Sequence, residues 1–201
     1  ACPNFSLLDA SGLLAALFPG LSRWMYQNND RPALLQRNLE YLDQRYQNGT
    51  PPSPALFLAA LFGPSLEEMA MAYHRDGIPH VQAPDVTYTA FMKEICTTAS
   101  VPGRVGKQLF AILALQPSLC RIPPRHPSSI VTKPEFADAL AYFRLEAGTR
   151  KKDRTSPEWW DAFLVESPSV TLSEPAADQA RPAKRRRKRR RRHHRTAQTA
   201  A

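Results

Sequence analysis

The stretch SPALFLAALFG, residues 53–63, decides the fold of this 201-residue chain. Ser53 is a residue type that caps helices, and Pro54 stands at the first helical position, where its missing N–H removes no hydrogen bond. The residues that follow are apolar nearly all round, and a helix without a polar face belongs in the interior of a fold. We therefore predict that residues 53–63 form a helix at the centre of the core.

The segments on either side repeat apolar residues at the spacing of a helix. Residues 30–49, DRPALLQRNLEYLDQRYQNG, carry one apolar stripe, and Asn48-Gly49 provides a helix stop. The stripe comprises Leu34, Leu35, Leu39, Leu42 and Tyr46. Residues 84–100, 101–116 and 156–166 show the same periodicity. Because no stretch of useful length alternates apolar and polar residues as a strand would, the pattern predicts an all-α fold, an irregular array of short helices.

Two capping boxes predict further helix starts. In this motif a Ser or Thr and a Glu three residues later each bind the other's backbone N–H. Ser65 with Glu68 marks one start, and Thr132 with Glu135 marks another. The second of these helices should end at Gly148 and turn inward Phe136, Leu140 and Phe143. The Pro-rich residues 116–134 should form a long exposed loop.

The positive charge of the chain is concentrated near its C-terminus. The chain has 27 basic and 18 acidic residues, but eleven of the basic ones lie in residues 181–195, RPAKRRRKRRRRHHR. Residues 1–180 therefore carry a net charge of about −2, from 16 basic and 18 acidic residues. Such a basic arm commonly binds nucleic acid, an anionic membrane or an acidic protein. A membrane is the weaker choice, because no amphipathic segment adjoins the arm and no apolar run approaches the roughly 20 residues of a membrane span.

From about Ser167 onward the chain contains no aromatic residue and is rich in Pro, Ala and charge. Such a segment cannot bury enough apolar surface to offset its ordering entropy. The predicted organisation is a helical body, residues 1–166, followed by a disordered tail, residues 167–201, that carries the basic arm. The chain begins at Ala1 rather than Met, which fits a fragment of a longer protein.

The sequence contains no catalytic constellation. It has no Asp-x-Asp pair, no Gly-x-x-x-x-Gly-Lys-Ser/Thr phosphate loop and no Gly-x-Ser-x-Gly nucleophile elbow. His74, His80 and His126 lack the spacing and the Cys partners of a zinc site, so we expect surface histidines. Trp159-Trp160 could stack on bases, but adjacent residues of a helix point in different directions. One of these indoles should therefore be a core residue and the other partly exposed.

The cysteines indicate a reducing compartment. Cys2, Cys96 and Cys120 lie far apart and form no CxxC pair. An odd number of widely spaced cysteines argues against a disulfide framework and fits a cytoplasmic location. We expect all three to be small buried apolar side chains. The apolar start of the chain, residues 1–21, lacks the positive region of a signal peptide.

Three segments, in this order and before an arginine-rich end, carry a family resemblance. They are SVPGRVGKQLFAILALQ (residues 100–116), KPEFADALAYFRLEA (133–147) and SPEWWDAFLVE (156–166). Together with LLAALFPGL (13–21) and PSPALFLAALFGP (52–64), they are similar to the C-terminal half of bacterial poly(A) polymerases. Those enzymes are relatives of the class II CCA-adding tRNA nucleotidyltransferases.

The resemblance implies a division of labour with a nucleotidyltransferase head domain that this chain lacks. In that family the head holds ATP and Mg²⁺ through a Gly-Ser loop and Asp-x-Asp carboxylates, while the helical body and tail hold the RNA. The resemblance thus implies no catalytic residue, cofactor or metal on this chain. It implies a non-catalytic portion of a polynucleotide adenylyltransferase that binds single-stranded 3′ ends and supports 3′-polyadenylation in the bacterial cytoplasm.

The resemblance also implies which residues of the body contact RNA. Arg104 and Lys107 match the start of a helix that is basic in the family, although Gly103 stands where another basic residue is usual. The basic segment that precedes KPEF in the family is reduced here to Arg121, Arg125 and Lys133. Arg144 is a further candidate.

The remaining candidates lie in two basic runs. The cluster RKKDR has an alternative reading as a solvated loop after a helix C-terminus, where cations are favoured. The candidates are Arg150, Lys151, Lys152 and Arg154 in that cluster, and Arg181, Lys184, Arg185, Arg186, Arg187, Lys188, Arg189, Arg190, Arg191, Arg192 and Arg195 in the arm.

A second hypothesis stays open beside the polymerase. The chain would then be a stand-alone, non-enzymatic helical module that its basic tail tethers to nucleic acid or to an acidic partner. The coding sequence upstream of Ala1 discriminates between the two. A Gly-Ser loop and an Asp-x-Asp strand there would favour the polymerase, whereas a start codon would favour the module.

Overall fold

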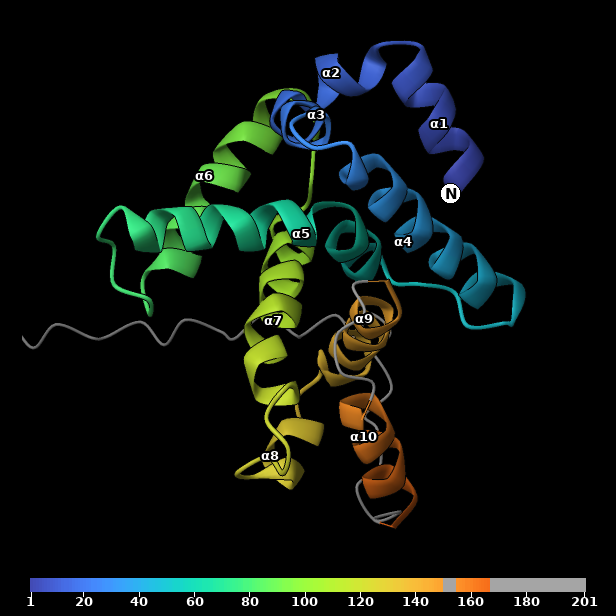
Figure 1. The fold of residues 1–201 in the computed structure, drawn as a ribbon, viewed down its shortest axis with the longest axis vertical. Coiled ribbons are helices and arrows are strands. Elements are labelled where there is room, and N and C mark those ends of the chain that lie inside the picture. The colour runs from blue at the N-terminus through green and yellow to red at the C-terminus, as the bar shows by residue number, and fades with distance from the viewer. Residues whose placement is uncertain (150–154, 167–201) are drawn as a thin grey trace, which may run out of the picture.

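The computed structural model describes residues 1–149 and 155–166, and within these ranges it contains ten helices and no strand (Figure 1). The prediction of an all-α fold made of short helices is confirmed. The helices are α1 (Cys2–Ala10), α2 (Leu13–Leu17), α3 (Pro19–Tyr26), α4 (Asp30–Gln47), α5 (Pro54–Arg75), α6 (Ala83–Thr98), α7 (Gly103–Leu119), α8 (Pro127–Val131), α9 (Phe136–Thr149) and α10 (Thr155–Glu166).

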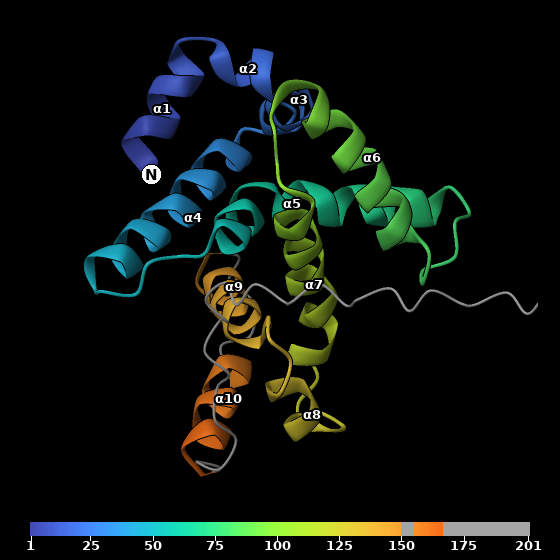
Figure 2. The ribbon, with the colours of Figure 1, turned by 180° about the vertical axis from the view of Figure 1, so that it is seen from behind.

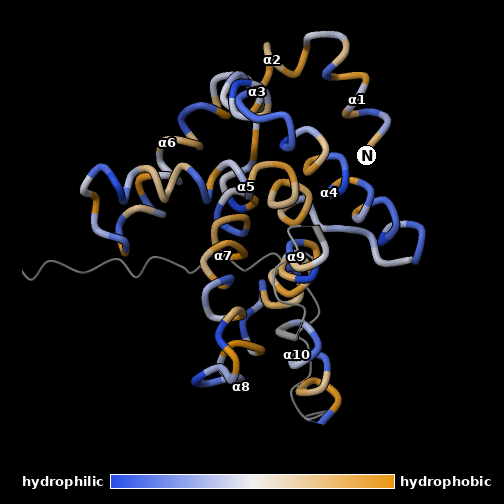
Figure 3. The backbone as a smooth tube through the Cα atoms, in the orientation of Figure 1, coloured by the Kyte–Doolittle hydropathy of each residue, from blue (hydrophilic) through white to orange (hydrophobic). Residues whose placement is uncertain are grey.

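Helix α5 is the centre of the molecule. It contacts α3, α4 and α6 on one side and α7 and α9 on the other, an arrangement that Figure 2 shows from behind. Leu56, Ala59 and Ala60 are fully buried, and the apolar positions cluster on α5, α7 and α9 (Figure 3). The Ser53 hydroxyl accepts a hydrogen bond of 3.0 Å from the Leu56 N–H, as expected of a helix cap. The prediction of a central helix that begins after Ser53 is therefore confirmed.

Helix α5 nevertheless continues beyond Gly63, so the helix predicted over residues 53–63 and the helix predicted to start at Ser65 are one. Ser65 lies inside it and donates a hydrogen bond of 2.8 Å to the Phe62 carbonyl, so the first capping box is wrong. A proline inside a helix leaves the carbonyl four residues earlier without its N–H donor, which here is the carbonyl of Ala60. The buried Asn38 amide donates to that carbonyl at 2.8 Å and replaces the missing bond.

Because α5 is one helix and not two, it contains a longer apolar run than the sequence predicted. Helix α5 has 22 residues and is the one helix within the described ranges that is long and apolar enough to cross a membrane by composition. The sequence reading, which divided this stretch in two, expected no such run. In the fold 56% of its most apolar window is buried, as in the core helix of a soluble protein.

The second capping box is also wrong, because α8 occupies its place. Thr132 follows the last residue of α8 and donates to the Ser129 carbonyl at 3.2 Å, while α9 begins only at Phe136. The predicted loop over residues 116–134 therefore contains the end of α7 and the whole of α8. Helix α9 runs through Gly148 to Thr149, one residue past its predicted end. Its predicted inward residues, Phe136, Leu140 and Phe143, are buried.

Most of the predicted helical stripes face the core. In α4 the leucines Leu35, Leu39 and Leu42 are buried, whereas Tyr46 is 69% exposed because it lies in the last turn, beyond the neighbouring helices. The helix ends at Gln47, and Gly49 has a φ of +76°, so the predicted stop is confirmed. Trp160 is fully buried and Trp159 is half-buried, as predicted for this pair.

The cysteines are free, but the prediction that they are buried is wrong for two of them. Cys2 is partly buried, and Cys96 and Cys120 are exposed. Cys96 follows the buried Ile95 on α6, and the step of about 100° between neighbouring helical residues turns its side chain outward. Cys120 follows the last residue of α7, where the chain leaves the core.

The first helix, α1, has no buried residue, but Phe5 and Leu8 pack partly buried against the core, and polar contacts add to this packing. The Ala1 ammonium forms an ion pair with Asp43 of α4, and the Cys2 N–H donates to the same carboxylate at 3.0 Å. These two donors lower the pKa of Asp43. The Tyr26 hydroxyl donates to Asp9, and this hydrogen bond raises the pKa of Tyr26.

Candidate nucleic-acid interface

A basic pocket of about 320 Å³ lies where the chain turns from α7 into α8. This turn is at the end of the molecule opposite α3 and α6 (Figures 1 and 2). Three cations and a histidine share the lining with two serines, and no carboxylate belongs to it. The lining residues are Pro117, Ser118, Arg121, Arg125, His126, Ser129, Ile130 and Lys133. We call this feature the basic pocket.

The backbone beneath the basic pocket is anchored to the core. The buried Gln116 amide donates to the Ile112 carbonyl at 2.9 Å and to the Ala139 carbonyl at 3.1 Å, which ties the end of α7 to α9. Leu119 and Val131 are buried on either side of the loop. Because these anchors occupy the inner face, the charged side chains between them are exposed to solvent.

Such a pocket favours an anion. Like charges gathered on one surface repel one another, and an anion that binds among them relieves the repulsion. Arginine presents a planar fork of donors that matches phosphate oxygens, and the hydroxyls of Ser118 and Ser129 are further donors at the same site. Contacts of this kind hold a phosphate backbone but do not distinguish bases.

The other predicted RNA contacts on α7 lie far from the basic pocket. Arg104 and Lys107 are exposed in the first two turns of the helix. Helix α7 ends at Leu119, so at 1.5 Å per residue Arg104 lies about 22 Å and Lys107 about 18 Å along the helix axis from its C-terminal end. The structure therefore brings Arg121, Arg125 and Lys133 together and separates them from this pair.

Arg144 has a protein partner. Its guanidinium forms an ion pair with Asp161, which joins α9 to α10, and the two side chains are 36% and 54% exposed. The partner carboxylate balances part of the charge that Arg144 would present to RNA. Arg150, Lys151, Lys152 and Arg154, and the arm residues 181–195, lie outside the described residues.

Sequence reasoning placed three histidines on the surface, and it missed that one of them lines the basic pocket. His126, together with Ser118 and Ser129, belongs to a segment interpreted as a simple loop. Their clustering in a Pro-rich segment beside Arg121 and Arg125 was the available signal.

The other two of these histidines lie away from the basic pocket, and the exposed rings of His74 and His80 are 5.3 Å apart. Among the described residues no group of three or more His, Cys, Asp or Glu side chains could hold a metal ion.

The fold and the basic pocket define an all-α protein whose surface gathers three cations, without a carboxylate, in one pocket. A family model for the arginine-rich C-terminus of polymerase A matches residues 76–195, more than half of the chain. The chain belongs to this family.

Curated relatives agree with the family assignment. Poly(A) polymerase I of Escherichia coli O157:H7 is 25% identical over 170 residues, which cover 82% of this chain and 37% of that protein. Poly(A) polymerase I of Salmonella typhi is 24% identical over 161 residues, 78% of this chain and 35% of that protein. The chain thus spans little more than a third of the length of these relatives.

Proposed function

We propose that this chain is the RNA-binding C-terminal part of a poly(A) polymerase and supports 3′-polyadenylation of RNA. The observation that carries the proposal is the basic pocket, where Arg121, Arg125 and Lys133 meet without a lining carboxylate in a chain of the polymerase A C-terminal family. A pocket of this chemistry suits the phosphate backbone of a single strand.

In this proposal, binding and catalysis are divided between two parts of one enzyme. The body holds the strand at the basic pocket, and the arm attracts phosphates from about a Debye length away, roughly 8 Å at physiological salt. A nucleotidyltransferase head outside this chain binds ATP and Mg²⁺ and transfers the adenylate. The body and arm thus raise affinity for the RNA without selecting its sequence, because phosphate contacts do not read bases.

The test is the salt dependence of RNA binding by the full chain. For single strands the slope of log affinity against log salt is about −0.7 per neutralised phosphate. The triple variant Arg121→Ala, Arg125→Ala and Lys133→Ala should therefore make the slope less negative by about 2. Fluorescence anisotropy with a labelled single-stranded oligonucleotide measures both quantities.

A matched variant removes the same charge elsewhere. Arg23, Arg37 and Lys93 are exposed on α3, α4 and α6, and none of them lines the basic pocket. Their triple alanine variant should leave the slope within about 0.7 of the wild type, the value of one phosphate contact. Equal slopes for the two triple variants, or binding that ignores salt, would contradict the proposal.

A second experiment tests the division of labour. The full chain, incubated with ATP, Mg²⁺ and an RNA oligonucleotide, should leave the length of the oligonucleotide unchanged on a denaturing gel. Poly(A) polymerase I of Escherichia coli serves as the positive control. An oligonucleotide lengthened by this chain alone would place catalysis within it and overturn this part of the proposal.

A further inference from the structure

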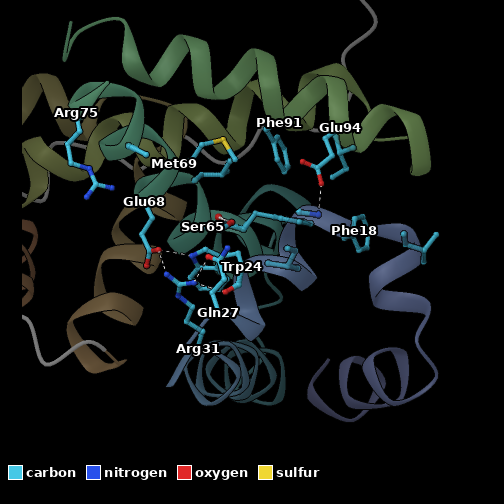
Figure 4. Close-up of a pocket in the computed structure, with 17 residues that line it drawn as sticks. Phe18, Trp24, Gln27, Arg31, Ser65, Glu68, Met69, Arg75, Phe91 and Glu94 are labelled. Carbon is cyan, nitrogen blue, oxygen red and sulfur yellow. Dashed lines mark hydrogen bonds and ion pairs between the residues drawn. The ribbon is translucent and has the colours of Figure 1, made fainter. Parts of the chain in front are cut away.

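A second cavity, of about 340 Å³, lies between α3, α5 and α6 (Figure 4). Of these helices, α5 is the central one, and α3 and α6 lie toward the end of the molecule opposite the basic pocket (Figures 1 and 2). Its apolar wall is made of aromatic rings and a thioether, among them Phe18, Phe62, Met69 and Phe91. The volume is at the lower end of the range of about 300–1,000 Å³ for pockets that hold small molecules. We call it the α3–α5–α6 cavity.

One end of this cavity presents a carboxylate oxygen. The Gly20 N–H donates a hydrogen bond of 2.6 Å to Glu94 Oε1, which holds the half-buried Glu94 side chain in the cavity wall. A Cβ atom at Gly20 would lie 2.3 Å from that oxygen, so a larger residue there would displace the carboxylate. The second oxygen, Oε2, accepts no hydrogen bond within residues 1–149 and 155–166. It is therefore available to an N–H donor.

The other end presents a cation. Glu68 Oε2 accepts hydrogen bonds from the Trp24 indole at 2.8 Å and from Arg31 at 2.6 Å, so Glu68 and Arg31 neutralise each other. The Arg31 guanidinium also lies 4.6 Å from the centre of the Trp24 ring. Arg75 also lines the cavity and has no ion-pair partner in the described part of the chain. Figure 4 shows Arg75 and Glu94 at opposite ends of the cavity.

We infer that the α3–α5–α6 cavity binds a purine nucleotide that carries an exocyclic amino group. Aromatic and thioether groups favour a flat ring, Glu94 Oε2 accepts the amino N–H, and Arg75 binds the phosphate. An apolar side chain of a protein partner would leave both Glu94 and Arg75 without a partner. The choice of a nucleotide over other aromatic anions rests on the proposed function, in which the chain handles RNA.

Calorimetric titration of the full chain with AMP, GMP and purine riboside 5′-monophosphate tests this inference. The last nucleotide lacks the amino group. Because a hydrogen bond to a charged group is involved, AMP or GMP should bind roughly tenfold more tightly than the analogue. The Gly20 amide resonance should shift in the same titration, since this N–H is bonded to Glu94.

Variants at the two ends of the cavity should separate the two contacts. Glu94→Gln keeps an oxygen for the Gly20 N–H but places an NH₂ group where Oε2 stands, so the preference over the analogue should disappear. Arg75→Ala should reduce AMP affinity to that of adenosine and leave adenosine binding unchanged. Arg37→Ala and Lys93→Ala, which alter exposed residues outside the cavity, should bind AMP as the wild type does.

The inference is overturned if neither AMP nor GMP binds at millimolar concentration, or if Glu94→Gln keeps the preference for the amino group. These outcomes are distinct from failure of the proposed function. Glu94→Gln leaves the basic pocket intact, so the salt slope of RNA binding should not change. Conversely, a chain that ignores RNA but binds AMP with the predicted preference would overturn the proposed function alone.

Discussion

The side-chain amide of Asn38 donates a hydrogen bond of 2.8 Å to the carbonyl oxygen of Ala60, across the contact between α4 and α5. In a regular helix this carbonyl would accept the N–H of residue 64, but residue 64 is proline. Both Asn38 and Ala60 are buried, so water does not reach the carbonyl. A side chain from a neighbouring helix therefore satisfies the acceptor that Pro64 leaves open, and α5 continues through it.

Asn38→Leu should lower the free energy of unfolding by about 1–3 kcal/mol, because it leaves a buried acceptor unsatisfied. Pro64→Ala restores an N–H that can donate to the Ala60 carbonyl. Asn38→Leu should therefore lower the free energy of unfolding by less in the Pro64→Ala background. Urea denaturation of the two single variants and the double variant measures this coupling. Strict additivity of the two substitutions would show that Asn38 does not compensate for Pro64.

Gly63→Ala should destabilise the protein by about 1–3 kcal/mol, although alanine is normally the better helix residue. The added Cβ would lie 2.2 Å from the hydroxyl oxygen of Tyr142, which is fully buried in α9. Gly103→Ala is the matched control, since a Cβ there meets nothing within 4 Å. Thermal unfolding should show a lower Tm for the first variant only. A stabilised Gly63→Ala would contradict the close approach of α5 and α9.

Trp160→Phe should lower the free energy of unfolding by about 1–3 kcal/mol, because the lost indole N–H leaves a buried carbonyl without its donor. Trp160 donates to the Leu119 carbonyl at 3.1 Å and joins α10 to the end of α7. Trp159→Phe keeps that bond, and Trp159 is only half-buried, so its effect should be smaller. Urea titrations measure the free energy of unfolding of both variants. An equal loss of stability in the two would contradict the role of the Trp160 hydrogen bond in joining α10 to α7.

Asp161→Asn should raise RNA affinity if Arg144 contacts phosphate, because the substitution removes the carboxylate that pairs with the guanidinium. Stability should change by only about 1 kcal/mol or less, as for exposed ion pairs. The control is the double variant Arg144→Ala with Asp161→Asn. Its RNA affinity should not rise above that of the wild type. No gain in Asp161→Asn would remove Arg144 from the set of RNA contacts.

Deletion of residues 181–195 removes eleven basic residues and should flatten the salt slope more than the basic-pocket variant does. The slope should become less negative by several units, up to about 8 if every cation meets a phosphate. The change in salt slope caused by the deletion and that caused by the basic-pocket variant should add approximately, because the pocket and the arm are separate sets of cations. An unchanged slope after the deletion would show that the arm does not bind the strand.

The sequence by itself determined the helices whose signals are local. Ser53-Pro54 and the apolar run after it predicted the start and the central place of α5, and Asn48-Gly49 predicted the end of α4. Capping, stop signals and apolar periodicity depend on residues within a few turns of one another, so they can be read along the chain. The division of Trp159 and Trp160 between surface and core followed from the same helical geometry.

Tertiary structure decided what depends on residues far apart in the chain. Asn38 is 22 residues from the carbonyl that it satisfies, so the local signals alone predicted two helices, over residues 53–63 and from Ser65, where one exists. Glu94 is 74 residues from the Gly20 N–H that holds it in the α3–α5–α6 cavity. The capping box at Ser65 failed for this reason, because α5 continues through Pro64. Local hydrogen-bond donors compete with distant partners, and packing decides which of them win.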